Sequence, residues 1–184
     1  TAGDSTPGAH VLIHGALVQG VLQAQEVVFK ENVEMESNVE SINIQNGTLT
    51  LAGLSGLTIA SDARTVMEDE GAPGRFEDLR IGDHLKVHAR LLDGQRVLPT
   101  ELERTTPSSS IVVHAPVELA ADPLIVLADT SIDTSRIPDK DFVGLYGTIG
   151  RVPFFEKVVI GRPVWVKGIL TGSIATWGSV GTNR

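Results

Sequence analysis

Apolar and polar residues alternate over short stretches of this chain, and turn residues separate the stretches. Residues 48–51 alternate strictly and follow Asn46-Gly47, a dipeptide typical of tight β-hairpin turns. Residues 33–44 alternate more loosely, and residues 124–128 form a short apolar run. No stretch keeps an apolar period of about 3.6 residues over several helical turns, so long helices are not expected. The pattern predicts an all-β protein.

One stretch of this pattern occurs again later in the chain. Residues 76–91 and 155–170 align without a gap, with identical residues at Phe76 and Phe155, Glu77 and Glu156, Ile81 and Ile160, Gly82 and Gly161, Val87 and Val166, and Leu91 and Leu170. Residues 8–17 resemble the second half of the stretch, with Gly8, His10, Ile13, His14 and Leu17 opposite Gly82, His84, Val87, His88 and Leu91. A period of about 75–80 residues predicts tandem small β-barrels. We expect them at residues 32–106 and 111–180, after the second half of a repeat at residues 1–31.

The segments between the strands suggest how these repeats are arranged. Residues 105–110 contain Pro107 and three serines and are expected to link the two repeats. Residues 62–75 are expected to form a polar loop with room for a helical turn, and residues 143–152 an addition without a counterpart in the first repeat. Closing each repeat into a barrel removes its strand edges, whereas a half-repeat leaves them open. We therefore expect residues 8–30 to pair with a neighbouring unit or with a second molecule.

Composition narrows the classes of partner. Apolar residues make up 41% of the chain and aromatic residues only 4%, so the core must consist mainly of aliphatic side chains. The net charge is −8 and no basic tract is present, which makes nucleic acid an unlikely ligand and disfavours anionic membrane surfaces. The chain has no cysteine, so disulfides and thiolate metal sites are excluded. No segment is apolar enough to predict a membrane-spanning helix.

The order of turns and strands in the first repeat resembles the DUF5666 family. The resemblance is carried by Val39-Glu40, Asn46-Gly47, Phe76-Glu77-Asp78-Leu79, Gly82-Asp83-His84-Leu85-Lys86-Val87 and Asp93-Gly94. The second repeat departs from the family pattern at Arg162-Pro163 and Thr171-Gly172. The resemblance implies a small OB-like barrel, often in tandem, in bacterial proteins that are commonly exported. The family has no established activity, so the resemblance assigns no catalytic residue.

Four histidines are the candidates for a metal site or a pH-sensitive contact: His10, His14, His84 and His88. Each pair is four residues apart on a predicted strand, so its two members share a face about 13 Å apart. That separation is too large for one ion with ligand bonds of about 2.0–2.1 Å. Leu85 and Val87 alternate with the second pair and are expected to face the core, which places the histidines outward, toward solvent or the neighbouring repeat. We expect no metal ion and no cofactor.

Aromatic residues offer a possible partner surface. Trp165 lies between Val164 and Val166 and is therefore expected on the outer face of a strand. Such a side chain usually packs against another surface, either within the protein or on a partner. Trp177 and Tyr146 are candidates for the same surface.

Acidic and catalytic patterns give weaker signals. Glu31, Glu34 and Glu36, then Glu68, Asp69 and Glu70, then Asp129, Asp133, Asp139 and Asp141 lack EF-hand or RTX spacing, so we expect them on solvated loops. No nucleophile elbow, zinc-protease motif or P-loop is present. We therefore expect no enzyme.

The function expected from the sequence is a structural or protein-binding β-barrel module of an extracytoplasmic bacterial protein. Self-association is a further possibility. The alternative is an OB-like barrel that binds an oligosaccharide or single-stranded nucleic acid, which would require several exposed aromatic side chains in one groove.

Overall fold

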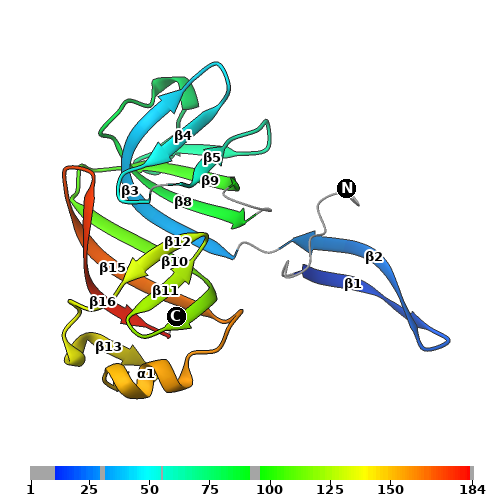
Figure 1. Cartoon of the computed structure of the whole chain (residues 1–184). Coiled ribbons are helices and arrows are strands. Elements are labelled where there is room, and N and C mark those ends of the chain that lie inside the picture. The colour runs from blue at the N-terminus through cyan, green and yellow to red at the C-terminus, as the bar shows by residue number, and fades with distance from the viewer. Residues whose placement is uncertain (1–10, 30–31, 55, 92–95, 183–184) are drawn as a thin grey trace.

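The computed structural model describes residues 11–29, 32–54, 56–91 and 96–182, and it is dominated by β-strands (Figure 1). An N-terminal hairpin consists of β1 (Val11–Val18) and β2 (Val21–Phe29). The first unit contains β3 (Val33–Asn43), β4 (Thr48–Leu51), β5 (Thr58–Ala60), β6 (Val66–Asp69), β7 (Ala72–Pro73), the 3₁₀ turn η2 (Phe76–Asp78), β8 (His84–Leu91) and β9 (Arg96–Thr105). The second unit contains β10 (Ser110–Ala121), β11 (Leu124–Leu127), β12 (Thr130–Asp133), η3 (Asp139–Asp141), β13 (Phe142–Gly144), β14 (Gly147–Thr148), α1 (Arg151–Lys157), β15 (Pro163–Thr171) and β16 (Ile174–Gly181). The all-β prediction is confirmed.

Five strands of the first unit close into a barrel. β3 pairs with β4, β4 with β5, β5 with β9, β9 with β8, and β8 again with β3. Residues of β3 alternate between buried and half-buried from Val33 to Val39, as expected for a strand with one face on a core. Closure leaves this barrel without an open edge along its circumference.

The second unit has the same pairing order but does not close. β10 pairs with β11 and β15, β11 with β12, and β15 with β16. Residues 124–133 and 174–181 are fully described, and no pairing joins β12 to β16. This unit therefore differs from the expected closed barrel.

The two units share one sheet, because their first strands pair with each other. Met35 of β3 pairs with Val87 of β8, and Val113 of β10 pairs with Val166 of β15. Met35 and Val113 also pair with each other, with Glu34 opposite His114 and Glu36 opposite Val112. The pairing is thus symmetric about Met35 and Val113. The connection at 106–109 lies near the expected boundary, but the units are not separate.

The small hairpin β13–β14 corrects the prediction for residues 143–152. β13 runs parallel to the last strand of its unit, with Phe142 opposite Val180, just as β6 runs parallel to β9, with Met67 opposite Leu102. The amide of Ile149 donates to the carbonyl of Phe142, and the amide of Gly74 donates to that of Met67. This segment therefore has a structural counterpart in the first unit. The expected loop at 62–75 contains that counterpart, β6–β7.

The hairpins β1–β2, β8–β9 and β15–β16 each have one β-bulge at the equivalent position. The register shifts between His14 and Gly15, between His88 and Ala89, and between Lys167 and Gly168. The extra residue lies on the second strand of each hairpin, at Gln25, Thr100 and Gly178. A Cβ added to Gly15 would lie 2.1 Å from the carbonyl oxygen of Gln23, and one added to Gly168 would lie 2.4 Å from that of Thr176. The β1–β2 hairpin therefore has the local geometry of β15–β16, although it stands apart from both units (Figure 1).

Candidate functional site

The sheet shared by the two units carries a row of polar and aromatic side chains on its outer face. Register pairs run from His88 on β8 to Glu34 on β3, then to His114 on β10 and Trp165 on β15. Residues directly opposite on neighbouring strands point to the same face, with Cβ atoms about 4.5–5.5 Å apart. The row therefore crosses the boundary between the units without a break.

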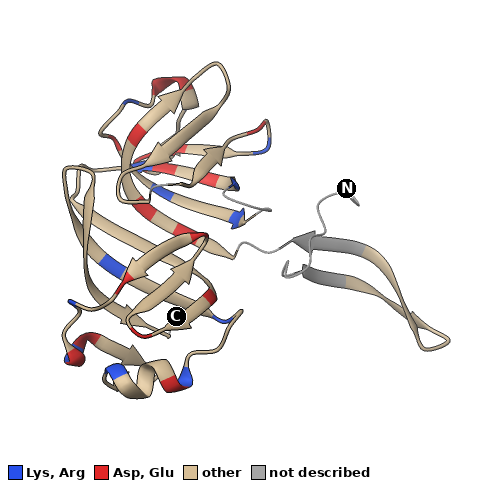
Figure 2. Cartoon of the chain, in the orientation of Figure 1, with Lys and Arg blue, Asp and Glu red and all other residues tan. Residues whose placement is uncertain are grey.

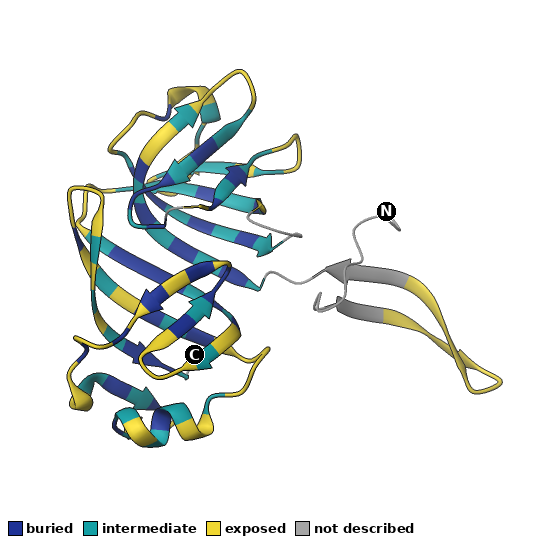
Figure 3. Cartoon of the chain, viewed as in Figure 1, coloured by how far each residue is buried: buried dark blue, intermediate teal, exposed yellow. Residues whose placement is uncertain are grey.

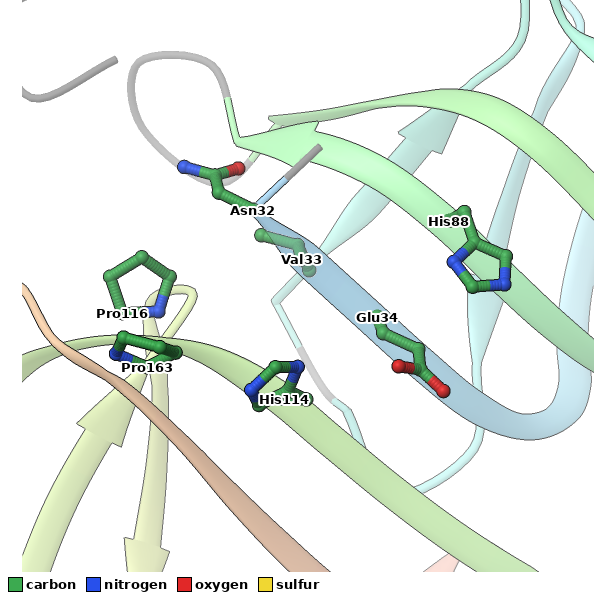
Figure 4. Close-up of a pocket in the computed structure, with 7 residues that line it drawn as sticks. All are labelled: Asn32, Val33, Glu34, His88, His114, Pro116 and Pro163. Carbon is green, nitrogen blue, oxygen red and sulfur yellow. The ribbon is translucent and has the colours of Figure 1, made fainter. Parts of the chain in front are cut away.

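A groove of about 260 Å³ lies along this boundary (Figure 4). It is lined by Asn32, Val33, Glu34, His88, His114, Pro116 and Pro163. Figure 4 shows Glu34 on β3 between His88 and His114, with the two prolines at one end. The lining offers one carboxylate, two imidazoles and an amide, so it can make hydrogen bonds to a small polar molecule or a peptide.

A buried polar network lies further along the same face. His84 is only 2% exposed, and its Nδ1 lies 2.6 Å from Oδ1 of Asn38. Its Nε2 lies 3.0 Å from Oε1 of Glu36, and the Ser110 hydroxyl donates to the same carboxylate oxygen. Because Ser110 belongs to β10, the network joins the two units.

The environment of Glu36 shifts its acidity. Partial burial alone would raise the pKa of this carboxyl group. The hydrogen bonds from Ser110 and His84, together with the nearby charges of His84 and Lys86, outweigh burial and hold the pKa of Glu36 below its usual value. The network therefore favours an ionised carboxylate at the boundary.

A second groove lies beside the β13–β14 turn of the second unit and shares Pro163 with the boundary groove. Its volume is about 550 Å³, and it is lined mainly by the β13–β14 turn and by residues 157–164. Leu145 and Tyr146 form the tip of that turn and are 68% and 98% exposed. Val159, which also lines the groove, is exposed as well. Large exposed apolar residues gathered beside a groove are typical of protein-binding surfaces.

The structure places the four candidate histidines in different settings. His10 lies outside the described residues, and His14 is exposed on the N-terminal hairpin. His88 lines the boundary groove, whereas His84 is buried. His84 points outward as expected, and of the two expected surroundings, solvent and the neighbouring repeat, it meets the neighbouring repeat, because Ser110 of β10 lies beside it together with Asn38 and Glu36. Within the described part of the chain, no three His, Asp or Glu side chains are arranged to hold a metal ion.

The three aromatic candidates do not form one surface. Trp165 lies on the outer face, where its ring covers Gly181 and the Lys167 ammonium lies 5.2 Å from the ring centroid. Trp177 is half-buried and packs against the hydrophobic core. Tyr146 lies at the tip of the β13–β14 turn. Only Trp165 continues the row at the boundary.

The sequence prediction missed the residues that face the histidines across the boundary. Glu34 and Glu36 lie on β3 rather than on a solvated loop, and Glu68, Asp69 and Asp133 are also strand residues. The alternation of Glu34, Glu36 and Asn38 with Val33, Met35 and Val39 could have placed the acidic residues on an outer face. No sequence signal pairs β3 with β10, so His114 and Ser110 could not have been added.

Residues 37–103 match the model of a protein family described as a domain of unknown function, DUF5666. This segment belongs to DUF5666. The DUF5666 segment extends from Ser37 in β3 to Glu103 in β9 and so covers most of the closed barrel. The chain matches no curated protein and no solved structure. No helix among the described residues is long and apolar enough to cross a membrane.

Proposed function

We propose that this chain is a non-enzymatic, protein-binding module built from tandem OB-like units, and that it belongs to an exported bacterial protein. The observation that carries the proposal is the exposure of large apolar side chains at two separate places. One is the β1–β2 hairpin, with Leu17, Val18, Val21 and Leu22, and the other is the β13–β14 turn, with Leu145 and Tyr146. Exposed apolar surface of this kind is expected to be covered by another protein.

The arrangement of the titratable residues supports a structural role for the boundary. Both ring nitrogens of the buried His84 contact protein atoms, and the facing carboxylate of Glu36 accepts hydrogen bonds from within the protein. A general base needs a free position from which to reach a substrate proton. These groups are instead engaged in joining the two units.

Charge and family support the expected partner and location. Lys and Arg residues are scattered among acidic residues over both units in Figure 2, and the net charge of −8 disfavours nucleic acid. The extracytoplasmic location rests on the resemblance to DUF5666, whose members are commonly exported. Fractionating the bacterium that encodes the protein would test it. We expect the protein in the envelope or medium, and recovery with the cytoplasmic fraction would contradict this location.

Affinity capture from an envelope extract tests protein binding. We expect the immobilised chain to retain a defined protein, and we expect the double substitution Leu145→Ser with Tyr146→Ser to abolish or reduce its retention. Ile81→Ser is the matched control, because Ile81 is 69% exposed on the first unit, away from the groove. Protein binding is contradicted if capture is the same for all three forms and for an unrelated β-barrel.

The boundary groove supports a second candidate function, the binding of an oligosaccharide. Two imidazoles and a carboxylate line it, and Trp165 continues their row on the same face. The test is to titrate soluble oligosaccharides and follow the imidazole proton resonances of His88 and His114 by NMR. Saturable shifts that disappear in His114→Ala but persist in His14→Ala would favour this candidate, and the absence of shifts would eliminate it.

A further inference from the structure

The N-terminal hairpin carries core-type residues at positions that are covered in both units. Leu17 pairs with Leu22 at the same place where Leu91 pairs with Val97 in β8–β9 and Leu170 with Ala175 in β15–β16. Val97 is fully buried and Leu170 is 6% exposed, whereas Leu17 and Leu22 are 73% and 50% exposed. All described side chains of β1–β2, from His14 to Gln25, are exposed (Figure 3). The same local structure therefore has its apolar face buried in both units and exposed in the N-terminal hairpin.

The two units show which strand pairs along the edge of such a hairpin. The first strand of each unit pairs antiparallel with the first strand of its hairpin, β3 with β8 and β10 with β15. Glu34 lies opposite His88, and Val112 lies opposite Lys167. His88 and Lys167 immediately precede the register shifts opposite the bulges of β9 and β16, and His14 holds that place opposite the bulge of β2. β1 and β2 pair only with each other among the described residues, so the outer edge of β1 is open where β3 or β10 would lie.

The first strands of the two units, β3 and β10, cannot fill that place while the fold is intact. β3 is already paired with β4, β8 and β10. β10 is already paired with β3, β11 and β15. A second copy of the folded chain meets the same restriction, since both of its first strands are occupied.

We propose that the β1–β2 hairpin binds a β-strand of the β3 type, supplied by a partner polypeptide, along the open edge of β1. This proposal rests on the proposed protein-binding function and specifies its partner. The incoming strand runs antiparallel to β1 and places an outward residue, equivalent to Glu34, opposite His14. Its alternate residues are apolar, as Val33, Met35 and Val39 are in β3, and together with the segment that follows they cover Leu17 and Leu22. Main-chain hydrogen bonds provide the attachment, and the alternating apolar residues provide the selectivity.

A peptide with the sequence of residues 32–51, which spans β3 and β4, is the probe. We expect the labelled peptide to bind the full chain saturably in fluorescence anisotropy. We also expect NMR shifts in the amides of residues 11–15 of the full chain, which the register of β3 with β8 places opposite the peptide. A control peptide with serine in place of Val33, Met35 and Val39 keeps the charges of the probe but lacks its apolar face, so it should not bind.

Two double variants of the full chain separate the two faces of the hairpin. One variant combines Leu17→Asn with Leu22→Asn and alters the face that a β3-type strand and the segment after it would cover. It should weaken peptide binding at least about tenfold. Val18→Asn with Val21→Asn alters the other face, where Val18 and Val21 are also paired and exposed, and should leave binding within about twofold. The two variants remove comparable apolar side chains from the same hairpin.

Three results would overturn the proposal. The first is that the peptide shows no saturable binding up to about 1 mM. The second is that both double variants weaken peptide binding equally. The third is that sedimentation shows the intact chain associating with itself through the hairpin. Capture of a partner through Leu145 and Tyr146 would still support the proposed function in each case. Failure of the hairpin inference and failure of the protein-binding proposal are therefore distinguishable.

Discussion

Replacing His84 with alanine tests whether the buried network holds the two units together. The substitution removes the contacts of Nδ1 with Asn38 and of Nε2 with Glu36, at 2.6 Å and 3.0 Å. A neutral, partly buried hydrogen bond contributes about 1 kcal/mol. The contact with Glu36 is discounted to about 1 kcal/mol because that side chain is 32% exposed and can be hydrated again. Lost packing around the imidazole adds about 1 kcal/mol, so the free energy of unfolding should fall by about 3 kcal/mol.

The assay is urea denaturation followed by circular dichroism, with His88→Ala as the matched control. His88 lies on the same strand and the same face but is only half-buried, so its replacement should cost less than about 1 kcal/mol. Ser110→Ala, alone and combined with His84→Ala, completes a double-mutant cycle across the boundary. We expect a coupling energy of at least about 0.5 kcal/mol, because both side chains bind Oε1 of Glu36.

The reasoning would be refuted if His84→Ala and His88→Ala destabilised the protein equally, or if the cycle showed no coupling. A wild-type protein that unfolds in two separate transitions would refute the shared boundary more directly. Strand pairing between β3 and β10 predicts that both units unfold together.

Three other measurements test the structure. Phe154→Ala should lower the free energy of unfolding by about 3–5 kcal/mol, because this fully buried ring stacks edge-on with two neighbouring phenylalanine rings; a loss below about 1 kcal/mol would contradict the packing. Gly181→Ala should displace the indole of Trp165, since a Cβ there would lie 2.4 Å from the ring. We expect a shift in tryptophan emission and a decrease of about 1–3 kcal/mol in the free energy of unfolding, measured with heat or urea. An unchanged emission spectrum would contradict this contact. Because the pKa of Glu36 is lowered in the folded state, its ionised form contributes stability above its ordinary pKa of 4.5 and loses that contribution as the pH falls through the lowered value. The stability difference between the wild type and Glu36→Gln should therefore shrink on acidification, and a difference that stays constant down to about pH 2 would contradict the assigned shift.

The structure within each unit was largely predictable from the sequence. Alternation placed Leu85 and Val87 on the core side of β8, and the looser alternation of residues 33–44 corresponds to the buried Val33, Met35 and Val39 of β3. The turn after β3 lies where Asn46-Gly47 indicated, although it spans residues 44–47. These features depend on neighbouring residues and on a period of two, which a single sequence displays directly.

The boundary site was not predictable in the same way. His84 was expected on the outer face, and it lies there, but it is buried because Ser110 and Glu36 come together over it. The counterpart of β6–β7 at β13–β14 was also missed, since the two segments share a hydrogen-bonding pattern rather than a residue pattern.

By itself, the sequence determined the all-β class, the strand faces, the DUF5666 resemblance and the repeated hairpin stretch. Only the tertiary structure decided that β3 and β10 pair, that the second unit stays open, and that the β1–β2 hairpin stands uncovered. The physical reason is that main-chain hydrogen bonds between distant strands use groups that nearly every residue has, so they leave little trace in the sequence. Side-chain periodicity records which face of a strand is buried, but it does not record which strand lies beside it.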